Sequence, residues 1–118
     1  LNPHNAELMK KSEEVITIMP AISKLKKRGI KISGPLVADT IFIENYKKYD
    51  VIVGMYHDQV LAPFKALYNF NAINITIGLK YIRVSPDHGI AKDLIGKKIA
   101  NPQSFIKTVE FLNKIKNV

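Results

Sequence analysis

The stretch Val51-Ile52-Val53-Gly54-Met55-Tyr56-His57-Asp58-Gln59 decides the fold and the functional site that we expect for this 118-residue chain. Its first half is a short apolar run, which suits a strand buried between helices better than a half-exposed strand. Its second half places an imidazole beside a carboxylate and an amide. Because open α/β sheets bind ligands outside the carboxyl ends of their strands, we expect a functional site to begin at His57.

The residues upstream of this stretch predict two helices and another strand. Acidic side chains near residue 12, followed by apolar residues at helical spacing, predict a helix over residues 12–29. Pro20 lies inside this pattern and predicts a kink or a break. Residues 30–32 alternate as a short strand does. A polar start and apolar spacing predict a second helix over residues 39–49.

The residues downstream continue the alternation of helices and strands. Residues 58–67 read as a helix, residues 72–77 and 81–84 as strands, and residues 89–95 as another helix. Pro102 opens a last helix with one apolar face. Alternating elements of this kind predict an α/β fold with helices layered on a sheet.

The composition bounds the class of protein. A length of 118 residues with 47% hydrophobic residues predicts one compact α/β unit over residues 1–118. Since no apolar run approaches the roughly 20 residues that span a bilayer, we expect no membrane segment. The chain has no cysteine, which excludes disulfides and thiolate metal sites and fits a reducing cytoplasm. Leu1 is not an initiator methionine, so we expect a segment of a longer chain.

The net charge of +8 raises the alternative of a non-catalytic basic module that binds nucleic acid. The basic residues are nearly all lysines spread along the chain. Only Arg28 and Arg83 can make the bidentate forks with which proteins recognise phosphates and bases. Solvated lysine-rich faces explain this distribution better, so we expect no nucleic-acid partner.

The histidines are the first candidates for chemistry. His4, His57 and His88 each lie in an expected loop or at the end of an element, beside polar residues. Neutral imidazole is a common ligand of divalent metals, and a neighbouring carboxylate can orient the ring. Taken singly, each histidine is more often a hydrogen-bonded loop residue, and the wide spacing of the three is no metal signature.

Lys65, Asn74 and Arg83 are the next candidates. Lys65 and Arg83 each lie among apolar residues and can point inward towards an anion. Long cationic side chains also reach solvent from such positions, and pairing of Arg83 with Asp87 would explain its place equally well. The glycines show neither a dinucleotide-binding nor a P-loop spacing, so a nucleotide would have to bind by another route.

Five motifs resemble, in order, the C-terminal part of the 4-hydroxythreonine-4-phosphate dehydrogenase family. They are Leu1-Asn2-Pro3-His4, Gly34-Pro35-Leu36-Val37-Ala38-Asp39-Thr40, Met55-Tyr56-His57-Asp58-Gln59, Asn74-Ile75-Thr76-Ile77-Gly78-Leu79 and Asp87-His88-Gly89-Ile90-Ala91. The resemblance implies an α/β fold of αβα layers, like the isocitrate and isopropylmalate dehydrogenases, of which this chain is an incomplete C-terminal portion. It also implies a cytoplasmic homodimer whose active site is shared between subunits.

The resemblance implies an NAD(P)⁺-dependent oxidation of 4-phosphooxy-L-threonine in pyridoxal phosphate biosynthesis, followed by loss of CO₂. A divalent ion (Zn²⁺, Mg²⁺ or Co²⁺) is held by three histidines, two of which match His4 and His57, while the third lies upstream. A Lewis-acid metal lowers the pKa of the substrate's hydroxyl. Family positions that bind the phosphorylated hydroxy amino acid match Lys65, Asn74 and Arg83.

The remaining roles concern proton transfer and the cofactor. Asp39 and Asp58 lie in motifs near the metal, and each is a candidate proton acceptor or orienter of a ring. Residues 88–101 are similar to the adenosine-binding loop of the isocitrate and isopropylmalate dehydrogenases, which implies cofactor contacts at His88, Ala91, Asp93 and Asn101. A related decarboxylating dehydrogenase that acts on another hydroxy acid stays open as an alternative.

Overall fold

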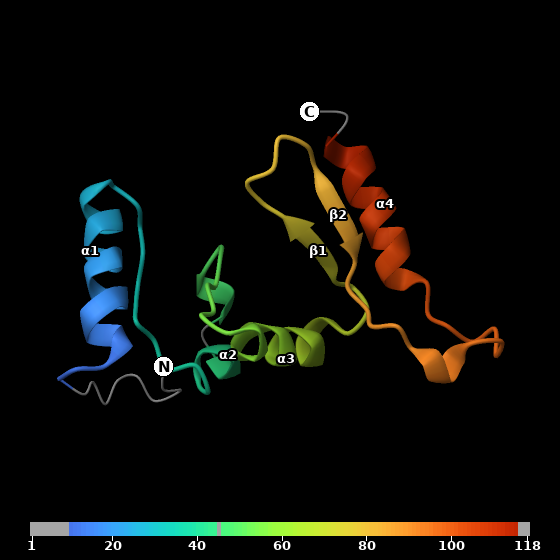
Figure 1. The fold of residues 1–118 in the computed structure, drawn as a ribbon, viewed down its shortest axis with the longest axis horizontal. Helices are drawn as coiled ribbons and strands as arrows, with labels where there is room; N and C mark the ends of the chain where they lie inside the picture. The colour runs from blue at the N-terminus through green and yellow to red at the C-terminus, as the bar shows by residue number, and fades with distance from the viewer. Residues whose placement is uncertain (1–9, 45, 116–118) are drawn as a thin grey trace. The chain divides into compact units, whose positions relative to one another are not determined.

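The computed structural model describes residues 10–44 and 46–115, and the chain divides into two compact units, Leu1–Pro63 and Phe64–Val118 (Figure 1). It contains both helices and strands, which agrees with the α/β class in this coarse sense. In chain order the elements are the π-helix η2 (Glu14–Ile18), α1 (Met19–Lys27), α2 (Ile41–Glu44), the 3-10 helix η3 (Tyr46–Lys48), α3 (His57–Tyr68), β1 (Ile73–Thr76), β2 (Arg83–Pro86), the 3-10 helix η4 (Lys92–Leu94) and α4 (Gln103–Ile115).

The first helical stretch changes from π-helix to α-helix next to Pro20. Proline has no N–H, and its ring crowds the carbonyl four residues earlier, so the regular ladder of hydrogen bonds is interrupted there. The N–H of Met19 instead donates to the carbonyl of Glu14, five residues back, which is the π-helical pattern. The disturbance predicted at Pro20 is confirmed. The predicted stop is confirmed too, since Gly29 has a φ of +83° and its N–H donates to Lys26 O at 2.9 Å.

The two strands predicted in the first unit, over residues 30–32 and 51–55, are wrong. Both segments belong to neither a helix nor a strand. A strand needs a neighbour that completes its ladder of hydrogen bonds, and no described segment of this unit supplies one. Together with α1 these segments line an apolar cavity of about 430 Å³. The helix predicted over residues 39–49 is divided into the short helices α2 and η3.

The second unit is built on an antiparallel hairpin. Strands β1 and β2 pair in a register that places Ile73 opposite Pro86 and Thr76 opposite Arg83. Figure 1 shows α4 alongside this hairpin. At their junction lie Ala72, the one buried hydrophobic residue of the described chain, and the buried hydroxyl side chains of α4. The strand predicted over residues 72–77 is confirmed, and the one predicted over residues 81–84 begins two residues later than expected.

Two expectations for this unit are corrected by the structure. The helix predicted over residues 89–95 is only the single turn η4, because Ala91 has a left-handed φ of 46° that an α-helix cannot contain. The sheet of the described residues has two antiparallel strands, so these residues do not form the layered sheet that we expected. None of the helices within residues 10–44 and 46–115 is long and apolar enough to cross a bilayer.

Candidate functional site

The turn that precedes α3 is held by the side chain of Gln59. Its Oε1 atom accepts hydrogen bonds from the N–H of Met55 at 2.9 Å and from the N–H of Tyr56 at 3.3 Å. A glutamine in the first turn of a helix that reaches back to the preceding N–H groups is half of a capping box. This side chain therefore holds the turn that leads from residues 51–54 into α3, and with it the position of His57.

His57 is the first residue of α3, and its side chain is 76% exposed. Its Nδ1 atom lies 2.7 Å from Oδ1 of Asp58. An ionised carboxylate can only accept a hydrogen bond, so Nδ1 carries the proton. In the neutral ring this leaves the lone pair of Nε2 available to a ligand. A carboxylate that orients an imidazole in this way is common behind metal-binding histidines.

The other residues predicted near a metal do not complete a site within the described chain. Asp39 lies exposed in the turn before α2. His4 lies outside the described residues. Among residues 10–44 and 46–115, no three histidine, aspartate or glutamate side chains gather closely enough to hold a metal ion. The pair of His57 and Asp58 fits one part of a ligand set for a divalent metal, and further ligands would have to come from elsewhere.

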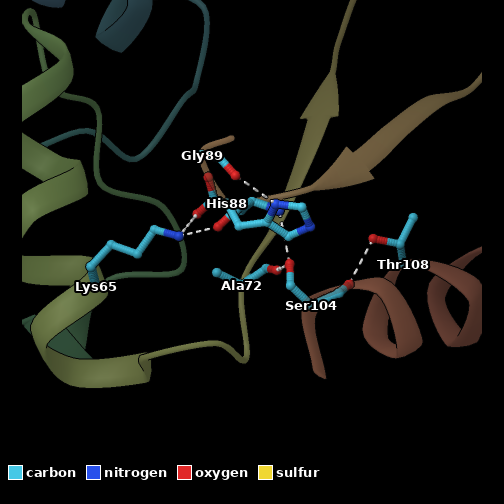
Figure 2. A network of polar contacts seen from close by, with 7 residues as sticks. Lys65, Ala72, His88, Gly89, Ser104 and Thr108 are labelled. Carbon is cyan, nitrogen blue, oxygen red and sulfur yellow. Dashed lines mark hydrogen bonds and ion pairs between the residues drawn. The ribbon is translucent and has the colours of Figure 1, made fainter. Parts of the chain in front are cut away.

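In the second unit, Lys65 lies near the end of α3 and contacts Asp87, the residue after β2 (Figure 2). Its Nζ atom lies 2.9 Å from Oδ2 of Asp87 and also donates to the carbonyl oxygen of Asp87. The pairing of Arg83 with Asp87, which we considered from sequence, is therefore wrong. Arg83 instead donates from Nη1 to Oγ1 of Thr76 at 2.8 Å.

Asn74 and Arg83 lie on one face of the hairpin. Asn74 is opposite Ser85, and Thr76 is opposite Arg83. Residues directly opposite each other, and residues two apart along a strand, point to the same side of a sheet. The structure thus brings these two predicted substrate contacts onto a common polar face, where both residues are exposed.

All four predicted cofactor contacts lie exposed in the segment between β2 and α4. His88 makes a contact of 3.1 Å between Nδ1 and the carbonyl of Gly89. Ala91 precedes η4, which contains Asp93. Asn101 accepts the N–H of Gln103 at 2.9 Å and so caps α4. No hydrogen bond of the described residues joins any two of the four predicted contacts.

Sequence reasoning missed Ser104, whose side chain is fully buried. Its hydroxyl accepts the N–H of Asp87 at 2.8 Å and donates to the carbonyl of Ala72 at 2.5 Å (Figure 2). In the sequence it reads as an ordinary serine in the first turn of a helix. The available signal was its spacing of seven, eight and eleven residues from Phe111, Leu112 and Ile115, which places Ser104 on the same helical face as these apolar residues.

Comparison with known proteins gives a consistent result. The sequence profile of the family described as "Pyridoxal phosphate biosynthetic protein PdxA" matches residues 1–112. A 4-hydroxythreonine-4-phosphate dehydrogenase from Sulfurihydrogenibium sp. is 47% identical over 119 residues, covering 100% of this chain and 37% of that protein. One from Xanthobacter autotrophicus is 45% identical over 118 residues, covering 98% of this chain and 33% of that protein.

A solved structure shares the fold as well. It is of a protein assigned as a 4-hydroxythreonine-4-phosphate dehydrogenase, from Salmonella typhimurium, and it matches with a TM-score of 0.73 and 37% sequence identity. The match covers 94% of this chain and 34% of that one. The chain spans about a third of the length of the curated relatives that it matches.

Proposed function

The chain belongs to the PdxA family of pyridoxal phosphate biosynthetic proteins, and from this premise we propose that the protein of which it is a segment oxidises 4-phosphooxy-L-threonine. The oxidant is NAD(P)⁺, and the reaction depends on a divalent metal ion. The product, 2-amino-3-oxo-4-phosphooxybutyrate, then loses CO₂ to give 3-amino-2-oxopropyl phosphate. The observation that carries this proposal within the chain is the exposed imidazole of His57, oriented by Asp58 at 2.7 Å.

The first unit supplies the groups for metal binding and proton transfer. His57 holds the metal through Nε2 together with His4, and Asp58 keeps the ring in the required tautomer. The bound ion (Zn²⁺, Mg²⁺ or Co²⁺) supplies Lewis-acid stabilisation of negative charge on the substrate's oxygens. Bound NAD(P)⁺ would supply the hydride acceptor. The hydroxyl proton of the substrate passes to a carboxylate, and Asp39 and Asp58 are the two candidates.

The second unit supplies groups for the substrate and the cofactor. Arg83 and Asn74 share a polar face on which an arginine fork and an amide can hold phosphate or carboxylate oxygens. Lys65 adds a further donor to this set. His88, Ala91, Asp93 and Asn101 contact the adenosine part of the cofactor, which suits their exposed positions between β2 and α4.

The organisation that we propose for the whole protein follows from the same family. It is a cytoplasmic homodimer with an isocitrate or isopropylmalate dehydrogenase-like αβα sheet, and its active site takes groups from both subunits.

Substitution of His57 tests the function in the full-length protein. His57→Ala should abolish turnover of 4-phosphooxy-L-threonine and lower the bound metal measured by elemental analysis, because one ligand is removed. His88→Ala is the matched control: it should leave the metal content unchanged and raise KM for NAD⁺. Normal metal content together with retained turnover in the His57 variant would refute the proposal.

A further inference from the structure

The ammonium group of Lys65 is held by two contacts with a single residue, Asp87. This group has three N–H donors, and the carboxylate and the carbonyl of Asp87 take two of them. The third donor is left for a ligand. The side chain of Lys65 is 34% exposed, so a ligand can reach it, whereas that of Asp87 is only 18% exposed.

Asp87 is itself fixed by a buried hydroxyl. Its N–H donates to Oγ of Ser104 at 2.8 Å, and the Ser104 hydroxyl donates to the carbonyl of Ala72 at 2.5 Å. Thr108 donates to the carbonyl of Ser104 at 2.9 Å, one turn further along α4. Figure 2 shows these contacts as one network from α4 to Lys65. Since Ser104 and Ala72 are buried, water cannot replace the bonds between them.

We propose that Asp87, anchored by Ser104, is a positioning residue that holds the ammonium of Lys65 in place for an oxygen of the phosphorylated substrate. This role rests on the proposed function for its ligand. The carboxylate also neutralises the charge of Lys65, so Lys65 acts mainly as a directed hydrogen-bond donor. Arg83, whose described partner is the neutral hydroxyl of Thr76, then carries the charge that recognises the anion.

Chemical labelling tests the positioning without any need for activity. In the full-length protein, Lys65 should react slowly with acetic anhydride, as read by peptide mass spectrometry. Asp87→Asn should speed its labelling by about fivefold, because a charge-assisted bond becomes a neutral one. Ser104→Ala should also speed the labelling of Lys65. If that variant does not fold, the labelling of Lys65 in Asp87→Asn alone tests the positioning.

Lys107 provides a matched control for the labelling. It pairs with Glu110 at 2.8 Å, and its side chain is 40% exposed, close to the value for Lys65. Glu110→Gln should speed the labelling of Lys107 and leave that of Lys65 unchanged. Unchanged labelling of Lys65 in Asp87→Asn would overturn the proposal.

Kinetics then separate positioning from a general structural role. Asp87→Asn should raise KM for 4-phosphooxy-L-threonine roughly tenfold and leave kcat within about twofold, since binding is lost uniformly. In a Lys65→Met background the same substitution should change KM by less than about twofold, because its partner is gone. An equal effect in both backgrounds would overturn the proposal. No turnover by the unaltered protein, together with the predicted labelling, would refute the proposed function and support the positioning.

Discussion

Gly54 directly precedes the turn that leads into α3. A Cβ atom at this position would lie 2.6 Å from Cγ1 of Val60 and 3.3 Å from the carbonyl oxygen of Tyr56. The first distance is far shorter than any normal contact between carbons. Because Gly54 has no side chain, Val60 of α3 can pack against its backbone, next to the turn that precedes His57.

Gly54→Ala should destabilise the full-length protein by about 1–3 kcal/mol, because the turn or Val60 has to move. Thermal unfolding measures the loss. Gly89→Ala is the control, since a Cβ there meets nothing within 4 Å and should leave the unfolding temperature nearly unchanged. Adding Val60→Ala removes the clash, so the double variant should lose less stability than the two single losses together. A strictly additive loss would contradict this explanation.

The individual site residues differ in how far sequence could predict them. His57 and Asp58 are adjacent in the chain, so their pairing was within reach of sequence reasoning, and the structure places them 2.7 Å apart. Lys65 and Asp87 are 22 residues apart, and only the fold brings them together. An Arg83–Asp87 pair explained the sequence equally well, and it is wrong because Arg83 instead bonds Thr76 across the hairpin. Long-range pairs depend on strand register, which single side chains do not encode.

Among the elements, α4 carries two different polar faces. Ser104 and Thr108 are buried one turn apart, facing the hairpin, and they bond backbone groups. Lys107 and Glu110 form an ion pair across one turn on a more exposed part of the helix. The hydrogen bond from Lys107, followed by the charge of Lys107, lowers the pKa of Glu110 below its ordinary value.

The lowered pKa of Glu110 predicts a dependence of stability on pH. A carboxyl group whose pKa is lower in the folded state stabilises the fold above its unfolded pKa, and this contribution is lost as the pH falls through the folded pKa. The free energy of unfolding, measured from neutral to acid pH, should therefore fall slightly less in Glu110→Gln than in the unaltered protein. The effect is small because Glu110 is exposed, and added salt should reduce it. The same loss of unfolding free energy at acid pH in both proteins would contradict a lowered pKa of Glu110.

The elements that sequence predicted correctly have local signals. The helix that ends before Gly29, α3 and α4 combine helical spacing with caps or stops within a few residues of their ends. The hairpin strand β1 was also predicted, because its partner follows closely in the chain. Residues 30–32 and 51–55 have the composition of strands, but a strand also needs a partner. The described chain lacks those partners, and no local pattern could reveal that.

For the whole molecule, the amount of exposed apolar surface exceeds what a stable domain shows. The chain is 47% hydrophobic, yet Ala72 is the one buried hydrophobic residue in the described part. Chains of this length normally bury most of the apolar surface that they expose when unfolded. The chain is about a third of the length of its relatives, and on the proposal that it is a segment of a longer protein, the rest of that protein covers this surface. Large exposed side chains include Ile43, Val51, Val53, Ile77 and Ile90.

The 118 residues expressed alone should therefore associate with themselves and bind a dye for apolar surfaces, as measured by light scattering and fluorescence. They should also show no oxidation of 4-phosphooxy-L-threonine, because no three histidine, aspartate or glutamate side chains of the described residues gather closely enough to hold a metal ion. The full-length protein, purified in parallel, is the control, and we expect it neither to aggregate nor to bind the dye. Turnover by the pure 118-residue chain would contradict the assignment of the site.

The hydroxyl of Ser104 also bears on how the second unit folds. Its two partners, Ala72 and Asp87, lie 32 and 17 residues before it in the chain. Neither bond can form until the hairpin and α4 have docked, because each bond joins α4 to a residue at the end of a strand. Interactions made after the transition state slow unfolding and hardly alter the folding rate. We therefore expect Ser104→Ala to speed the unfolding of the docked unit more than it slows folding, as measured by unfolding and refolding rates.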